Sequence, residues 1–183
     1  MPAIIESRPA LGHVLRAIVR ATLATCPPST SAMFTAAARK RLDKTSAWSP
    51  PSSKGLFSSH HGLAVPGKAL HDVLARARSL YGVGMGFASL GVLVVVVSAT
   101  IGLRWEQDGE MVDTLAAVDA DISQAIQSCK EELAGGRVSD LPSVRAAVAD
   151  LNTAVTGSFH DTEGWGGDFP FEKAAISIQY WKF

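Results

Sequence analysis

The sequence predicts a mainly α-helical protein with a single transmembrane helix, followed by a small antiparallel pair of helices and an irregular, aromatic-rich tail. Three observations lead to this fold class: one long uncharged segment, two amphipathic segments after it, and seven aromatic residues close to the C-terminus. The expected parts are a basic N-terminal region over 1–50, a linker over 51–68, a juxtamembrane and transmembrane helix over 69–105, an acidic helical hairpin over 106–157, and a tail over 158–183.

The uncharged segment covers residues 82–103 and contains no Asn, Gln or Pro. Its 22 residues would span about 33 Å as a helix, which matches the roughly 30 Å of hydrocarbon in a bilayer. Tyr81 and Trp105 bracket the segment, where aromatic rings favour the headgroup region. A buried core helix seldom stays apolar on every face for six turns, so we expect a spanning helix.

Small residues occupy the first half of this segment: Gly82, Gly84, Gly86, Ala88, Ser89 and Gly91. Gly82 with Gly86, and Gly84 with Ala88, form small-xxx-small pairs that let the backbone of a second helix approach closely. We therefore expect these residues to pack against a partner helix. The alternative is that glycine is simply frequent in membrane helices.

The formal net charge is zero, but residues 1–54 carry a net charge of +6 and residues 104–183 a net charge of −8. Residues 11–25 predict an amphipathic helix with one apolar face, formed by Leu11, Val14, Leu15 and Ile18, and with Arg16 and Arg20 opposite. An arginine-bearing, acid-poor helix at the N-terminus is typical of organelle presequences, so we expect a mitochondrial transit peptide. A plastid transit peptide and a retained basic arm are the alternatives.

Charges beside the uncharged segment indicate its orientation. Arg76 and Arg78 precede it, whereas Glu106, Asp108 and Glu110 follow it. The positive-inside rule then places the N-terminus in the matrix and the C-terminus in the intermembrane space of the mitochondrial inner membrane. A thylakoid or secretory-pathway membrane is the alternative location.

Two amphipathic helices are predicted after the span. Apolar residues recur at steps of three or four from Met111 to Leu133, before a Gly-Gly pair. A second helix follows, with Ser139 or Asp140 as N-cap and Gly157 at its end. In such an antiparallel hairpin each apolar stripe covers only the other, so we expect it to need a partner protein.

The tail contains the residues expected to anchor a partner protein: Trp165, Phe169, Phe171, Tyr180, Trp181 and Phe183. Large aromatic side chains bury ~150–250 Å² each and dominate many interfaces. Alternation over residues 176–180 indicates a short terminal strand. The alternative is that the aromatic side chains fold back over the helical hairpin.

No catalytic, nucleotide-binding or metal-binding motif occurs in the sequence. His160, Asp161 and Glu163 lie close together, but we interpret them as turn and surface residues rather than metal ligands. We therefore expect no enzyme activity, no cofactor, no metal and no nucleic-acid partner.

These expectations favour a non-catalytic, supernumerary single-pass subunit of a mitochondrial inner-membrane complex, such as a respiratory-chain complex, a supercomplex or the ATP synthase. Its partners would be the other subunits and the lipid bilayer. The main alternative is a membrane-anchored tether whose acidic C-terminal part recruits a basic soluble partner. An enzyme whose site no motif discloses is the third hypothesis.

Overall fold

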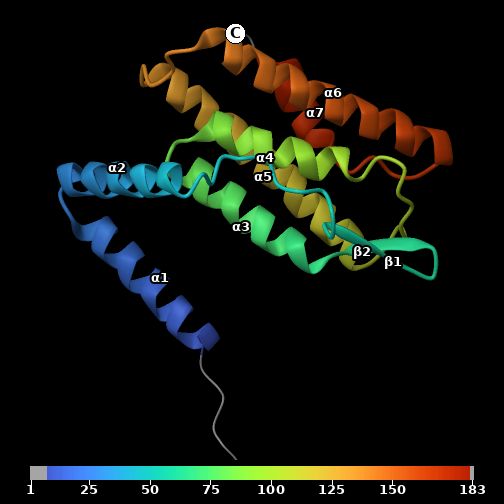
Figure 1. Cartoon of the computed structure of the whole chain (residues 1–183), viewed down its shortest axis with the longest axis horizontal. Helices are drawn as coiled ribbons and strands as arrows, with labels where there is room; N and C mark the ends of the chain where they lie inside the picture. The colour runs from blue at the N-terminus through green and yellow to red at the C-terminus, as the bar shows by residue number, and fades with distance from the viewer. Residues whose placement is uncertain (1–7, 182–183) are drawn as a thin grey trace, which may run out of the picture.

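A helical bundle around one central helix is the main feature of the computed structural model, which describes residues 8–181. Within that range the chain is mostly helical: α1 (Arg8–Thr25), α2 (Pro28–Lys44), α3 (Lys68–Gly82), α4 (Gly86–Ser98), α5 (Glu110–Ala134), α6 (Leu141–Trp165) and α7 (Glu172–Gln179). The strands are β1 (Phe57–His60) and β2 (Leu63–Pro66). Figure 1 shows α4 among α3, α5 and α6, with α7 beside α6 and α1 pointing away.

The predicted transmembrane helix over residues 82–103 is wrong. Among the residues that the structure describes, no helix is long and apolar enough to cross a membrane. The helix ends at Gly82, and Gly84 has a φ of +78°, which an uninterrupted α-helix does not allow. The next helix, α4, has 13 residues and is only about 20 Å long. The single-pass fold class deduced from this segment is therefore wrong as well.

The segment is apolar because α4 is the centre of the core. Leu90, Val92, Leu93, Val96 and Val97 are all fully buried. Three other helices, α3, α5 and α6, pack against α4 from different sides. A helix covered on several sides needs apolar side chains all round, and a lipid-exposed helix needs the same composition.

Two helices follow the core helix as expected, but α6 continues past the predicted end at Gly157 to Trp165, and the packing of both helices differs from the prediction. Asp140 is the N-cap of α6, and its carboxylate accepts a hydrogen bond from the Ser143 amide at 3.1 Å. Both α5 and α6 place their apolar stripes on α4 rather than chiefly on each other. The predicted two-helix hairpin is thus part of a larger bundle.

The segment predicted to be an irregular linker contains a β-hairpin. Strand β1 pairs antiparallel with β2, in a register that joins Phe57 to Pro66 and His60 to Leu63. The two residues of the turn, His61 and Gly62, have φ values of 52° and 84°, as a type I′ turn requires. The Ala64 amide donates a hydrogen bond to the Arg104 carbonyl, which ties the hairpin to the chain after α4.

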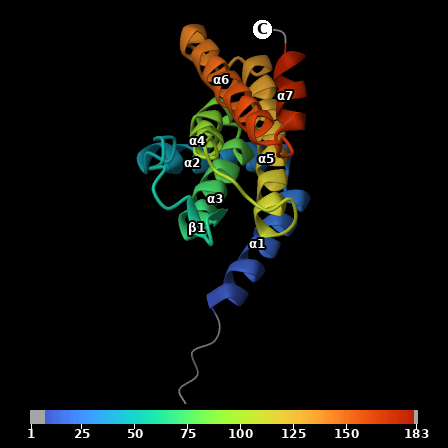
Figure 2. The same ribbon diagram turned by 90° about the vertical axis from the view of Figure 1, so that its right-hand side faces the viewer.

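The predicted N-terminal region divides into a free helix and an attached one. Residues predicted to form an amphipathic helix lie in α1, which projects from the bundle in both ribbon views (Figures 1 and 2). The side chains of Leu11 and Arg16 lie outside the described part. In contrast, α2 is fastened to the bundle: Arg39 Nε donates to the Val83 carbonyl at 2.7 Å, and Leu42 packs against the core.

Candidate docking groove

An open apolar groove lies between α6 and α7. Its volume is about 560 Å³. Nine residues line it, five of them apolar: Val155, Phe159, Phe169, Ala175 and Ile176, with Asn152, Thr156, Glu172 and Gln179. Phe159 is 43% exposed and Ile176 is 56% exposed. Large apolar side chains gathered in one hollow and open to solvent are the usual sign of a binding surface.

The chain forms this groove by reversing direction after α6. Gly166 ends α6 in the left-handed conformation, with a φ of +74°. The return segment brings α7 alongside α6 and α5. Asp119 of α5 fixes the start of α7, because its carboxylate accepts hydrogen bonds from the Ala174 amide at 2.8 Å and the Lys173 amide at 3.2 Å. Burial raises the pKa of Asp119, and these two amides act in the opposite direction.

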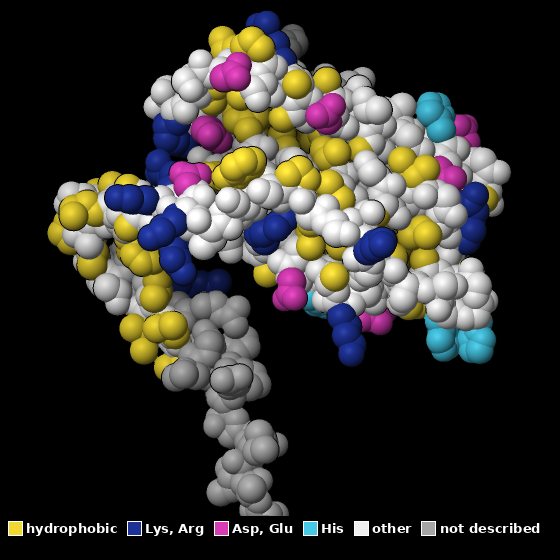
Figure 3. All heavy atoms as spheres, viewed as in Figure 1, with side chains coloured by type: hydrophobic (Ala, Val, Ile, Leu, Met, Phe, Trp, Pro, Cys, Tyr) yellow, Lys and Arg dark blue, Asp and Glu magenta, His cyan; other side chains and the backbone are white. Residues whose placement is uncertain are grey.

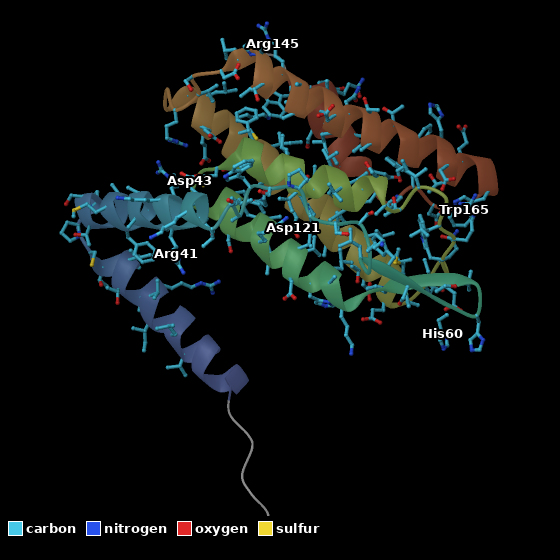
Figure 4. The ribbon with its side chains drawn as sticks, viewed as in Figure 1. Arg41, Asp43, His60, Asp121, Arg145 and Trp165 are labelled. Carbon is cyan, nitrogen blue, oxygen red and sulfur yellow. The ribbon has the colours of Figure 1, made fainter. Side chains whose placement is uncertain are left out.

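A second hollow of about 430 Å³ continues the groove along α6 towards Arg145. The two hollows share Asn152 and Gln179. From Arg145 to Phe159 the wall formed by α6 is about 21 Å long. In Figure 4, Arg145 and Trp165 mark the two end regions of α6. The groove is therefore long enough to hold about four turns of a helix.

Charge within the groove is sparse and uneven. Glu172, which is exposed, lines the first hollow, and Arg145, also exposed, lines the second. A bound helix with a positive charge at one end would therefore be favoured in the direction that places this charge near Glu172.

The small residues predicted to pack against a partner helix lie at the start of α4 and just before it. An added Cβ on Gly86 would overlap the backbone of Ser128 and Cys129 in α5, whereas one on Gly82 or Gly91 would meet nothing within 4 Å. Ser89 is fully buried, and its hydroxyl has no hydrogen-bond partner. Gly86 thus serves a close helix contact inside the chain, and packing of the other small residues against a partner helix stays a prediction.

The aromatic residues predicted to anchor a partner lie mostly over the bundle. Phe171 is fully buried, and the ring of Trp165 meets Trp105 edge to face at 5.2 Å. The ring of Trp181 stacks on Phe87 at 6.0 Å. Tyr180 remains 73% exposed.

Of the remaining two aromatic residues, one lines the groove and the other is not described. Phe169 packs edge to face against Phe159 at 5.3 Å and lines the groove. Phe183 lies outside the described residues. The irregular tail is wrong as a description of the fold, because α6 continues to Trp165 and α7 forms over Glu172–Gln179. Helix α7 also largely replaces the expected short strand over 176–180.

The histidines and carboxylates singled out in the sequence have structural partners or lie apart. Asp161 accepts hydrogen bonds at 3.0 Å from Arg104 Nη1 and from the Gly102 amide, and His160 lies 3.8 Å from Glu163. Figure 4 places His60 at the far end of the β-hairpin. Over residues 8–181, no group of three or more His, Cys, Asp or Glu side chains is arranged to hold a metal ion.

Two polar clusters join α3, α4 and α5. Asp121 accepts hydrogen bonds from Arg78 Nε at 2.9 Å and from Tyr81 Oη at 2.9 Å, and burial raises the pKa of Tyr81 to about 12. Glu132 of α5 lies beside the start of α4 and accepts a hydrogen bond from the Phe87 amide. Burial raises the pKa of Glu132 as well. Both clusters are part of the packing between α3, α4 and α5.

Comparison of the chain with protein-family models, curated proteins and solved structures gives no match.

Proposed function

We propose that this chain is a non-catalytic accessory protein of a mitochondrial assembly and that it acts by receiving a protein segment between α6 and α7. The observation that carries this proposal is the open apolar groove, with Phe159 and Ile176 exposed along it. An amphipathic helix is the segment that fits a groove of this length, because its apolar side chains recur every three or four residues along one face.

The chemistry of the groove supports binding rather than catalysis. Among the nine residues that line the first hollow, Glu172 is the one ionisable side chain. General acid–base and nucleophilic catalysis commonly rely on several ionisable or nucleophilic side chains that converge on the substrate. Apolar walls with a few polar side chains at the rim instead provide affinity and orientation.

The mitochondrial part of the proposal is supported by α1. Its apolar residues Val14, Leu15 and Ile18 are 55%, 60% and 56% exposed. An import receptor that recognises an apolar helical face would find this one uncovered. Figure 3 shows hydrophobic side chains over α1 and α2, with basic side chains beside them on α2.

A fusion of residues 1–26 to a passenger protein tests the import step. We expect the fusion to enter isolated mitochondria and Ile18→Glu to abolish entry. Ala17→Glu, which adds the same charge to a neighbouring exposed position away from the apolar face, should retain it. Equal import of the two variants would contradict a targeting role for α1.

The groove itself is tested by mild-detergent purification of tagged Ile176→Glu from mitochondria, with quantitative mass spectrometry of the partners. Thr153→Glu is the matched control, because Thr153 is an exposed α6 residue that does not line the groove. We expect Ile176→Glu to lose the partners that the wild type and Thr153→Glu recover stoichiometrically. Recovery of the same partners with all three proteins would rule out the groove as the docking site.

The second candidate function is recruitment of a basic partner by the acidic end of the molecule. The carboxylates of Glu106, Asp108, Glu110 and Asp113 are all exposed, over the loop before α5 and its first turn. Binding through these charges should weaken steeply between low and physiological salt, whereas apolar binding in the groove should not.

A further inference from the structure

We infer that the groove between α6 and α7 receives helix α1 from a second copy of this chain, so that two copies exchange their N-terminal helices. This inference rests on the proposed function in that it takes the groove to be a docking site. It names the occupant of that site.

The described apolar side chains of α1 are largely exposed. Val14, Leu15 and Ile18 are all more than half exposed, and they lie on one side of the helix. Their spacing of one, three and four residues is the pattern by which a helix enters an apolar groove. The 18 residues of α1 make a helix about 27 Å long, enough to fill the roughly 21 Å of groove between Arg145 and Phe159.

Helix α1 and the region that contains the groove carry opposite net charges. Helix α1 contains no Asp or Glu and three arginines, and residues 1–54 have a net charge of +6. The groove belongs to the part of the chain, residues 104–183, with a net charge of −8. Because Arg20 lies on the face of α1 opposite its apolar residues, this attraction acts between the two regions as a whole and not through a direct pair within the groove.

The connection between α1 and α2 is short and stiff. Cys26 and Pro27 link the two helices, Pro28 begins α2, and Pro27 has a φ of −55° and a ψ of 149°. Two consecutive prolines restrict the backbone to such extended values, which limits how far α1 can turn. Helix α2 is itself held by the hydrogen bond from Arg39 to Val83.

This connection directs α1 away from its own groove. Figures 1 and 2 both place α1 on the opposite side of the bundle from α6 and α7. A second copy, related by a two-fold axis, can present its α1 to this groove more readily than the chain can present its own. Each copy then supplies one helix and one groove, which makes a closed and symmetric dimer.

The experiment measures the mass in solution of the purified full-length chain by sedimentation equilibrium over a range of concentrations. The variants are Ile18→Glu in α1 and Ile176→Glu in the groove. Their controls are Ala17→Glu and Thr153→Glu, which add the same charge outside the contact. Circular dichroism verifies that all the proteins are folded.

We expect the wild type and both controls to be dimers. Each of the two variants should weaken dimerisation by about 100-fold or more, because the change acts at both symmetric contacts. An equimolar mixture of Ile18→Glu and Ile176→Glu should recover dimers. In that mixture one intact α1 and one intact groove remain available to each other.

Several results would overturn the inference. They are a wild-type chain with intact α1 that stays monomeric, dimers of Ile18→Glu as stable as those of the wild type, or no recovery in the mixture. A mature protein that begins after residue 25 would overturn it too, as would a monomer that binds anionic vesicles through α1. If the chain is monomeric and Ile176→Glu still loses its mitochondrial partners, the proposed function stands and this inference alone fails.

Discussion

Gly86 lies where the backbones of α4 and α5 come closest. A methyl group at this position would overlap the backbone of Ser128 and Cys129, which cannot move without shifting α5. We expect Gly86→Ala to lower the free energy of unfolding by about 1–3 kcal/mol. Urea unfolding followed by circular dichroism measures the change.

Gly91 provides the control for this prediction. It lies in the same helix, and a methyl group there would meet nothing within 4 Å. Gly91→Ala should therefore be neutral or stabilise the protein by up to about 1 kcal/mol, because alanine favours the helix. Equal destabilisation by both substitutions would refute the role given to Gly86.

Glu132 makes stability depend on pH. Burial raises its pKa in the folded chain above the ordinary value of 4.5, so the folded state holds its proton more tightly than the unfolded state does. The stability that this proton confers is complete below pH 4.5 and is lost as the pH rises through the raised pKa.

Replacement by glutamine should remove this pH dependence. In Glu132→Gln the amide oxygen still accepts a hydrogen bond from the Phe87 amide, and no charge has to be buried. We expect the variant to be more stable than the wild type at neutral pH, and the difference to shrink towards pH 4. Thermal unfolding over this range tests it, and parallel curves for the two proteins would contradict it.

At the scale of the elements, α7 depends on a carboxylate that is distant in the sequence. Asp119 accepts hydrogen bonds from two amides at the start of α7, whose own residues supply no side-chain cap. Asp119→Ala should lower the free energy of unfolding by about 1–2 kcal/mol and loosen α7. Hydrogen exchange should show that the substitution speeds the exchange of the α7 amides, relative to the wild type, more than that of the α4 amides. Unchanged protection of α7 would argue against this capping role.

Helices α1 and α2 should contribute differently to stability. A chain that begins at residue 27 lacks α1 and keeps the contacts of Arg39, Leu42 and Ala47 with the bundle. A chain that begins at residue 48 lacks all three contacts. We expect the first truncation to keep the wild-type free energy of unfolding in dilute solution and the second to lose about 2 kcal/mol or more. Equal unfolding midpoints in urea for the two truncated chains would contradict the division.

For the whole molecule, the central position of α4 decides how the chain folds. Leu93 is fully buried among the surrounding helices, whereas Ile101, just after α4, is 43% exposed. Leu93→Ala should cost about 2–5 kcal/mol of folding free energy, because it leaves a cavity in the core. Ile101→Ala should cost much less. Similar unfolding midpoints in urea would show that α4 is not the centre of the core.

The groove illustrates why sequence reasoning missed the candidate site. The sequence predicts that the second amphipathic helix ends at Gly157, which places Phe159 in an irregular tail. In the structure the helix continues to Trp165, and an added Cβ on Gly157 would lie 3.1 Å from Ile101 Cδ1. This glycine serves a close approach between segments far apart in the sequence, which local patterns do not reveal.

Sequence patterns located several of the helices, because apolar periodicity and capping residues are local properties. They indicated the helix over residues 11–25, offered Ser139 or Asp140 as the N-cap of α6 and ended α5 before Gly135, but they revealed neither α2 nor the helical form of α7. The turn at His61 and Gly62 could also be predicted from the sequence, because it depends on adjacent residues.

What surrounds the uncharged segment depends on the packing of the whole chain. Lipid and a shell of amphipathic helices both favour apolar side chains on every face, so composition alone does not distinguish them. The breaks at Gly84 and Gly102 and the packing of α3, α5 and α6 make α4 a core helix of 13 residues. The groove between α6 and α7 exists for the same reason, since it depends on contacts between residues that lie far apart along the chain.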